Sequence, residues 1–175
     1  MTIVDPSQLD FDTGRANLAA DPELADRFPS EIAGKDLQVT TMTADDWLTQ
    51  IGAGRRNKSA KAVQAYVRTA GKEVADLSMG FASYAPSPGN VAALAAVRTR
   101  GSDGASLTEA VIPLLMRSIE DPVVETIEVA AKSIRRVTDA ATPGQYPRYA
   151  YGSGDTVWVI DAEGRALHEI VAALP

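Results

Sequence analysis

The final part of the chain follows a continuous pattern of strand, turn, strand and helix. Within Asp155–Asp161, the residues Val157–Ile160 form an unbroken apolar run, which is typical of a strand buried on both of its faces. A shorter strand pattern at Tyr149–Tyr151 and a glycine-rich turn at Gly152–Gly154 precede it, and Glu163–Leu174 follows it with apolar residues at helical spacing. Such a unit cannot bury its own apolar face, so we expect it to share a sheet with other segments.

The same order of elements occurs earlier in the chain. Leu77–Tyr84 alternates in the manner of a strand, Ala85–Asn90 is a Pro/Gly-rich turn, and Val91–Thr99 returns as a second strand. Ser106–Ile119 then predicts a helix, which Pro113 should kink. Two such units predict an α+β fold, in which helices on one face cover a mainly antiparallel sheet of six or seven strands.

Capping and turn signals predict the remaining elements. Asp21 followed by Pro22 is typical of the start of a helix, and Pro29 should keep that helix short. Thr43 with Asp46 resembles a capping box, and glycines 52 and 54 should end the helix that it opens. Further elements are predicted as a strand at Leu37–Thr41, a helix capped by Ser59 that ends at Gly71, and a hairpin of Val124–Ala130 with Ser133–Thr138.

Length and composition indicate one folded domain. The chain has 175 residues, of which 45% are hydrophobic, and this suits a single core. No apolar run approaches the roughly 20 residues that a membrane helix needs, so no membrane span is predicted. The predicted core consists of Leu37, Val39, Trp47, Val67, Leu77, Met79, Phe81, Leu94, Val111, Leu115, Val157, Val159, Leu167, Ile170 and Leu174.

Negative charge is concentrated near the N-terminus. Residues 1–31 carry seven acidic and two basic side chains, a net charge of −5, whereas the rest carries sixteen and fifteen, a net charge of −1. We therefore predict an acidic N-terminal arm with a short helix at 1–28 and one α+β domain at 29–175. The first twenty or so residues have few large apolar groups, and we expect them to be mobile, or to be held only by docking on a basic patch or on a neighbouring chain. The lack of clustered Lys and Arg over the body argues against a nucleic-acid partner.

The residue types that most often carry chemistry are scarce. The chain has no cysteine and one histidine, so we predict neither a metal site nor a cofactor. We interpret His168 as a surface residue of the last helix and Ser153 as a turn residue, because no partner for either is apparent. The carboxylate pairs Asp45/Asp46 and Glu120/Asp121 lie at predicted helix ends, where capping explains them. We assign no catalytic residue.

One segment approaches the spacing of a phosphate-binding loop. Residues 52–59 read GAGRRNKS, which fits G-x-x-x-x-G-K-S except that Asn57 replaces the second glycine. Such a loop must leave a strand and enter a helix, but the preceding Asp45–Ile51 has a helical pattern. We therefore disfavour nucleotide binding and expect a basic connection between two helices.

The densest basic cluster lies in the same segment. Arg55, Arg56 and Lys58, followed by Lys61, could bind an anion or an acidic partner near the start of the next helix. Exposed charges are also the norm on protein surfaces, so a solvated connection is the alternative. These three residues, Arg55, Arg56 and Lys58, are our candidate site.

Three stretches resemble an uncharacterised α+β domain of secreted proteins and lipoproteins of high-GC bacteria. They are Pro29–Leu37, with the pattern P-x-E-I-x-G, the strand pair Tyr149–Val157, and the closing helix that ends in Ala173-Leu174-Pro175. The resemblance covers residues 29–175 and implies an extracytoplasmic location, but it implies no activity and no catalytic residues. The chain shows neither a signal peptide nor a lipidated cysteine; without the resemblance, we would expect a cytoplasmic protein.

The leading functional hypothesis is a non-enzymatic binding module for a protein or small-molecule partner at the cell envelope. The alternative is a carrier of a small apolar ligand, because the small residues Gly80, Ala82, Ala93 and Ala95 could line a cavity between sheet and helices. Small residues also occur where a helix packs closely on a strand. An enzyme of unrecognised class is a further alternative, and the sequence leaves the oligomeric state open.

Overall fold

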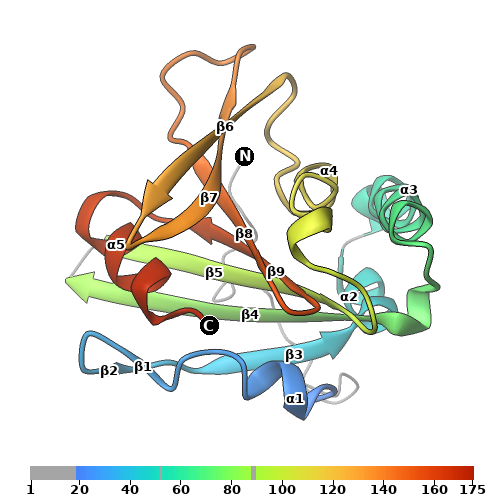
Figure 1. Ribbon diagram of the computed structural model, residues 1–175. Helices are drawn as coiled ribbons and strands as arrows, with labels where there is room; N and C mark the ends of the chain where they lie inside the picture. Colours follow the sequence, from blue (N-terminus) through green and yellow to red (C-terminus); the bar gives the residue numbers. More distant parts are fainter. Residues whose placement is uncertain (1–18, 52, 88–89) are drawn as a thin grey trace.

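A seven-stranded antiparallel sheet forms the centre of the molecule (Figure 1). The structure is a computed structural model, which describes residues 19–51, 53–87 and 90–175. The strand order in the sheet is β3-β4-β5-β9-β8-β7-β6. The strands are β3 (Val39–Thr43), β4 (Leu77–Ser87), β5 (Asn90–Thr99), β6 (Pro122–Val129), β7 (Lys132–Asp139), β8 (Arg148–Ser153) and β9 (Thr156–Asp161).

The apolar run at Val157–Ile160 lies in β9, the middle strand of this sheet. Because successive side chains of a strand point to opposite faces, Val157 and Val159 belong to one hydrophobic cluster, whereas Trp158 and Ile160 belong to another. The predicted burial of this strand on both faces is therefore confirmed.

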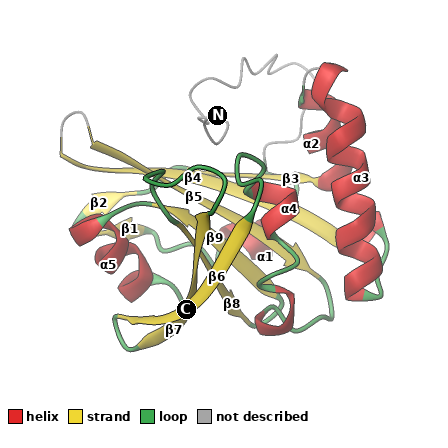
Figure 2. Cartoon of the chain, turned by 90° about the horizontal axis from the view of Figure 1, so that it is seen from above, coloured by secondary structure: helices red, strands yellow, loops and turns green. Residues whose placement is uncertain are grey.

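The first cluster lies between the sheet and a group of helices (Figure 2). Trp47 and Tyr66 from two of these helices pack in the same cluster as Met79 and Phe81 of β4 and Val97 of β5. The elements around this face are α2 (Ala44–Gln50), α3 (Ala53–Ala70), α4 (Ile112–Leu115) and the 3-10 helices η2 (Val74–Asp76) and η3 (Ala105–Leu107).

Helices also cover the second face, which corrects the prediction that they lie on one face only. Leu24 and Phe28 pack there with Trp158, and α5 contributes Ile170 and Val171 to the same cluster. The elements on this face are α1 (Pro22–Ala25), α5 (Gly164–Ala173) and a separate two-stranded sheet of β1 (Glu31–Ile32) and β2 (Lys35–Asp36). Helices lie on both faces because β9 and its neighbours carry apolar side chains on both faces of the sheet, and each apolar face must be buried by other elements. The α+β class and the antiparallel sheet are as predicted.

The predicted boundary at residue 29 falls inside the packed region. Leu24 has no exposed surface and Phe28 is 5% exposed, and the ring of Phe28 meets that of Trp158 edge-on at a centroid distance of 4.8 Å. The side chain of Asp21 accepts a hydrogen bond from the backbone N–H of Leu24 at 3.0 Å, as expected of the cap of α1. The predicted mobile arm lies mostly in residues 1–18, outside the described residues.

The helix predicted at Ser106–Ile119 is not continuous. It is replaced by η3, a series of turns, and α4, with Pro113 in the first turn of α4. Proline is tolerated in the first turn of a helix but breaks the interior of one, because it lacks the N–H that would donate a hydrogen bond to the carbonyl one turn back. The two strand-turn-strand units share one sheet as predicted, but α4 and α5 belong to the clusters on opposite faces.

The helix predicted to begin at Ser59 begins six residues earlier. The helix α3 starts at Ala53, so Gly54 lies within it and does not end the preceding helix, while Gly52 lies outside the described residues. Ser59 is fully buried in the helix, and its hydroxyl donates to the carbonyl of Arg55 at 2.8 Å, which is not a capping interaction. The sequence lacks a helix-breaking proline here, and a single glycine costs only about 1 kcal/mol, which packing outweighs.

The other predictions agree well with the structure. Thr43 caps α2 as predicted, since its hydroxyl oxygen accepts from the N–H of Asp46 at 3.1 Å, although the return bond of a capping box, from the backbone N–H of Thr43 to Asp46, is not among the contacts of α2. The hairpin of β6 and β7 turns at Ala130 and Ala131, both with a positive φ angle. Of the predicted core, only Leu37, Val39 and Leu115 are half-buried; the others are buried.

The small residue Gly80 accommodates close packing. A Cβ atom at Gly80 would lie 2.6 Å from the ring of Phe28 and 3.2 Å from Leu24. At this position the lack of a side chain is explained by the approach of α1 to the sheet, and not by a cavity.

Candidate functional site

The predicted basic cluster lies on the first half of α3. Arg55, Arg56 and Lys58 are all exposed on this helix. Nη2 of Arg56 donates to the carbonyl of Thr49 in α2 at 3.3 Å, which brings this side chain toward the connection between α2 and α3. The cluster is thus held on a regular helix and not on a flexible connection.

The structure adds Arg117 to this cluster. Its Nε donates to the carbonyl of Leu114 at 3.0 Å, and its Nη1 donates to the hydroxyl of Ser59. Its guanidinium carbon lies 4.8 Å from the ring centre of Trp47, in a cation–π contact. Three elements therefore fix this side chain, because Trp47 belongs to α2, Ser59 to α3 and Leu114 to α4.

The charge of Arg117 has no counter-charge in the part of the chain that the structure describes. Among the residues that the structure describes, no carboxylate lies within ion-pair distance of Arg55, Arg56, Lys58 or Arg117. Burial lowers the pKa of Arg117, and the nearby positive charge of Arg55 lowers it further. The Nη2 atom of Arg117 is buried without a hydrogen-bond partner. An added anion would offset this repulsion.

Arg55, Arg56, Lys58 and Arg117, which we call the basic surface, are all cationic hydrogen-bond donors. Guanidinium groups bind carboxylates and phosphates through charge-assisted hydrogen bonds, and a rigidly held guanidinium loses less entropy on binding. The hydroxyl of Ser59 donates to the backbone carbonyl of Arg55 and accepts from the guanidinium of Arg117. This surface therefore has the chemistry of an anion-binding site.

Sequence reasoning did not find Arg117 or the role of Trp47. Trp47 was expected only in the core, and Arg117 was placed in a helix that does not form. Ser59 and Arg117 are 58 residues apart, and no local pattern joins them.

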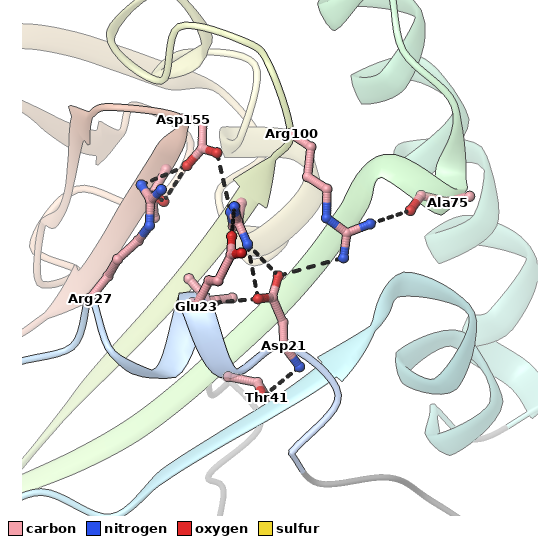
Figure 3. A network of polar contacts seen from close by, with 10 residues as sticks. Asp21, Glu23, Arg27, Thr41, Ala75, Arg100 and Asp155 are labelled. Carbon is pink, nitrogen blue, oxygen red and sulfur yellow. Dashed lines mark hydrogen bonds and ion pairs between the residues drawn. The ribbon is translucent and has the colours of Figure 1, made fainter.

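A second polar group surrounds Arg98 on β5, at the other face of the sheet (Figure 3). Its Nη1 lies 2.9 Å from Asp21, its Nε lies 3.1 Å from Asp155, and its Nη2 contacts Glu23. Two more guanidinium groups complete the group, with Arg27 at 2.6 Å from Asp155 and Arg100 at 3.8 Å from Asp21. We call these six residues the Arg98 network.

The Arg98 network is electrically balanced, since it has three carboxylates and three guanidinium groups. Burial alone would raise the pKa of Asp21, but hydrogen bonds from Ser78 and from the backbone of Leu24, with the charges of Arg98 and Arg100, lower it overall. Because all its charges are paired, this group joins α1 to the sheet and leaves no charge for a ligand.

The other sequence candidates are not brought together. Residues 53–59 are helical, so they lack the geometry of a phosphate-binding loop. His168 is exposed on α5, whereas Ser153 lies in β8. Asp46 accepts a hydrogen bond from the Thr43 hydroxyl at 2.9 Å at the start of α2. No cluster of three or more His, Asp or Glu side chains that could hold a metal ion occurs in the described part of the chain.

A cavity of about 350 Å³ lies beside α5. Its walls come from the β1–β2 hairpin, the end of β4 and the first turns of α5, and its polar side chains include Lys35, Tyr84 and Glu169. Sequence reasoning did not identify it, because its walls are distant in the chain.

Within the described ranges, none of the helices combines the length and the apolar character that crossing a bilayer demands. The chain matches no model of a protein family, no curated protein and no solved structure.

Proposed function

We propose that this protein is a non-enzymatic binding module that recognises an acidic segment of a partner protein through the basic surface. The observation that carries the proposal is the position of Arg117, which is half-buried against Trp47 and beside Arg55, without a neighbouring carboxylate among the described residues. Burying a charge is costly unless the charge is paired. A partner carboxylate would provide that pairing.

An acidic protein segment fits this surface better than a single small anion does. Arg55, Arg56 and Lys58 are spread along about one turn of α3, or roughly 5 Å of its axis. Successive carboxylates of an extended or helical segment can contact several of these cations at once. A segment with several contacts also gains from the additive effect of weak exposed ion pairs.

We also propose that the protein acts at the bacterial cell envelope. This part of the proposal rests on the resemblance of residues 29–175 to a domain of secreted proteins and lipoproteins. Fractionation of native cells should find the protein in an extracytoplasmic fraction. Its recovery in the cytoplasm alone would contradict this part and leave the binding proposal unaffected.

Titration with an oligoglutamate peptide tests the binding proposal. We expect binding that weakens as salt is added, because exposed ion pairs are screened. Trp47 should report it by a change in fluorescence, since Arg117 lies over its ring, whereas Trp158 is fully buried on the other face. An oligoglutamine peptide, which lacks the carboxylates, should not bind.

Paired variants locate the site. The double change Arg55→Gln with Arg56→Gln should weaken oligoglutamate binding about tenfold, because two charge-assisted contacts are lost. The matched control is Arg68→Gln, which removes an exposed arginine from the last turn of the same helix. Equal effects of the double variant and the control, or no binding at all, would contradict the proposal.

A further inference from the structure

The cavity beside α5 is separate from the basic surface and has the size of a small-molecule site. Its volume of about 350 Å³ lies within the range of known ligand pockets, roughly 300–1,000 Å³. Ala33, Pro86 and Ala166 supply apolar lining, while charged side chains reach it from β2 and from α5. In Figure 1 the β1–β2 hairpin lies near α5, on the side of the molecule away from α3.

A fixed polar pair forms part of the wall. The hydroxyl of Tyr84 donates to Glu169 at 2.6 Å, and Nε of Arg165 donates to the other oxygen of Glu169, also at 2.6 Å. The hydrogen bond from Tyr84, followed by that from Arg165, lowers the pKa of Glu169, and the same bond to Glu169 raises the pKa of Tyr84. At neutral pH Glu169 is therefore an anion that is held in place by Tyr84 and Arg165.

Two side chains of opposite charge line the cavity, and neither forms an ion pair with another described residue. The Nζ of Lys35 donates to the carbonyls of Ala85 and Pro86, at 2.6 and 2.9 Å, and keeps one N–H free. The side-chain carboxylate of Glu163, the residue before α5, makes no hydrogen bond or ion pair in the described part of the chain. The cation comes from β2 and the anion from the start of α5, so they face the same space from different elements.

We propose that this cavity binds a small zwitterion of the free α-amino acid class, with its carboxylate on Lys35 and its ammonium group on Glu163. A ligand with one charge would leave the other protein charge without a counter-charge. A dianion would be repelled by Glu163 and Glu169, and a dication would be repelled by Lys35 and Arg165. The apolar lining suits a short aliphatic side chain.

Calorimetric titration of the full chain with alanine, valine and leucine tests this proposal. Each is compared with its two single-charge analogues, the amine without the carboxylate and the acid without the amine. We expect at least one amino acid to bind about tenfold more tightly than both of its analogues, because each charge contributes a charge-assisted contact. Failure of all the amino acids to bind at about 10 mM, or equal binding of an analogue, overturns the proposal.

Variants assign the two ends of the ligand. Lys35→Met should weaken binding of the amino acid but not of the matching amine, and Glu163→Gln should weaken binding of the amino acid but not of the matching acid. The matched controls are Lys61→Met and Glu128→Gln, which remove exposed charges on α3 and β6. The assignment is overturned if the control variants lose binding of the amino acid, or if the two cavity variants bind it as tightly as the wild type does. The basic surface does not line this cavity, so the result with oligoglutamate neither supports nor weakens the proposal of an amino-acid site.

Discussion

Asp21 accepts hydrogen bonds in two roles, since it caps α1 and also pairs with Arg98. Its side chain is only 3% exposed, and it contacts the backbone of Leu24 and two guanidinium groups. The capping role could be predicted from the sequence, because Asp followed by Pro is a local signal. The ion pair could not, because Arg98 is 77 residues away.

We expect Asp21→Asn to lower stability near neutral pH and to have less effect in acid. The folded protein holds the pKa of Asp21 below its ordinary value. The contribution of its charge is therefore fully present above the pKa of the unfolded state, about 3.9, and is lost as the pH falls through the lower folded value. Urea unfolding of both proteins should show a large difference at about pH 7 that shrinks toward about pH 3.

The matched control for this prediction is Glu23→Gln. Glu23 contacts Arg98 but its side chain is 74% exposed, so its loss should cost less than about 1 kcal/mol. A constant difference between wild type and Asp21→Asn across the pH range would show that the charge of Asp21 contributes nothing.

Among the secondary-structure elements, the connection from β5 to α4 shows where local patterns fail. The sequence of Ser106–Ile119 predicts a long helix, but the chain just before it crosses the β8–β9 hairpin at close range. A Cβ at Gly104 would lie 2.3 Å from the carbonyl oxygen of Thr156, and one at Gly152 would lie 2.4 Å from the backbone of Gly104. A glycine inside a strand often marks such an approach, so Gly152 was an available signal.

Gly152→Ala should destabilise the protein by about 3 kcal/mol, because the added methyl group meets backbone that cannot rotate away. Ser153→Ala, at the next position of β8, should change the free energy of unfolding by less than about 0.5 kcal/mol. Denaturant unfolding of the two variants measures both values. If both variants lost less than about 0.5 kcal/mol, the backbone around Gly104 could move away from β8 at little cost, and the prediction would be wrong.

Over the whole molecule, the sequence indicated the sheet and its buried strand but not the two-sided cover. The apolar run in β9 already implied burial on both faces, yet the second layer depends on α1, which has only four residues. This part of the chain stabilises the second layer through Leu24, Phe28 and the Arg98 network, which contact residues far away in the sequence. Likewise, the basic surface was predicted in part, because three of its residues are adjacent in sequence and Arg117 is not.

A chain that begins at residue 29 should fold poorly, whereas one that begins at residue 19 should melt within a few degrees of the full chain. Removing Leu24 and Phe28 loses about 1.5–3 kcal/mol each, and removing Asp21 and Glu23 takes two of its three carboxylate partners from Arg98. That sum approaches the total stability of an ordinary domain, about 5–15 kcal/mol. The melting temperatures of the three chains are measured. If the chain from residue 29 melts within a few degrees of the full chain, the prediction is wrong.

The central position of β9 has a consequence for how the chain is made. Synthesis produces β3 to β5 first and β6 to β8 next, and only then the strand that lies between these two groups. Until β9 emerges, the inner edges of β5 and β8 have unpaired backbone groups, and such edges can pair with other chains. Pairing of β5 with β9 also joins residues far apart in the sequence, which slows folding. The nascent protein is therefore most exposed to misassembly in the interval before its middle strand is complete.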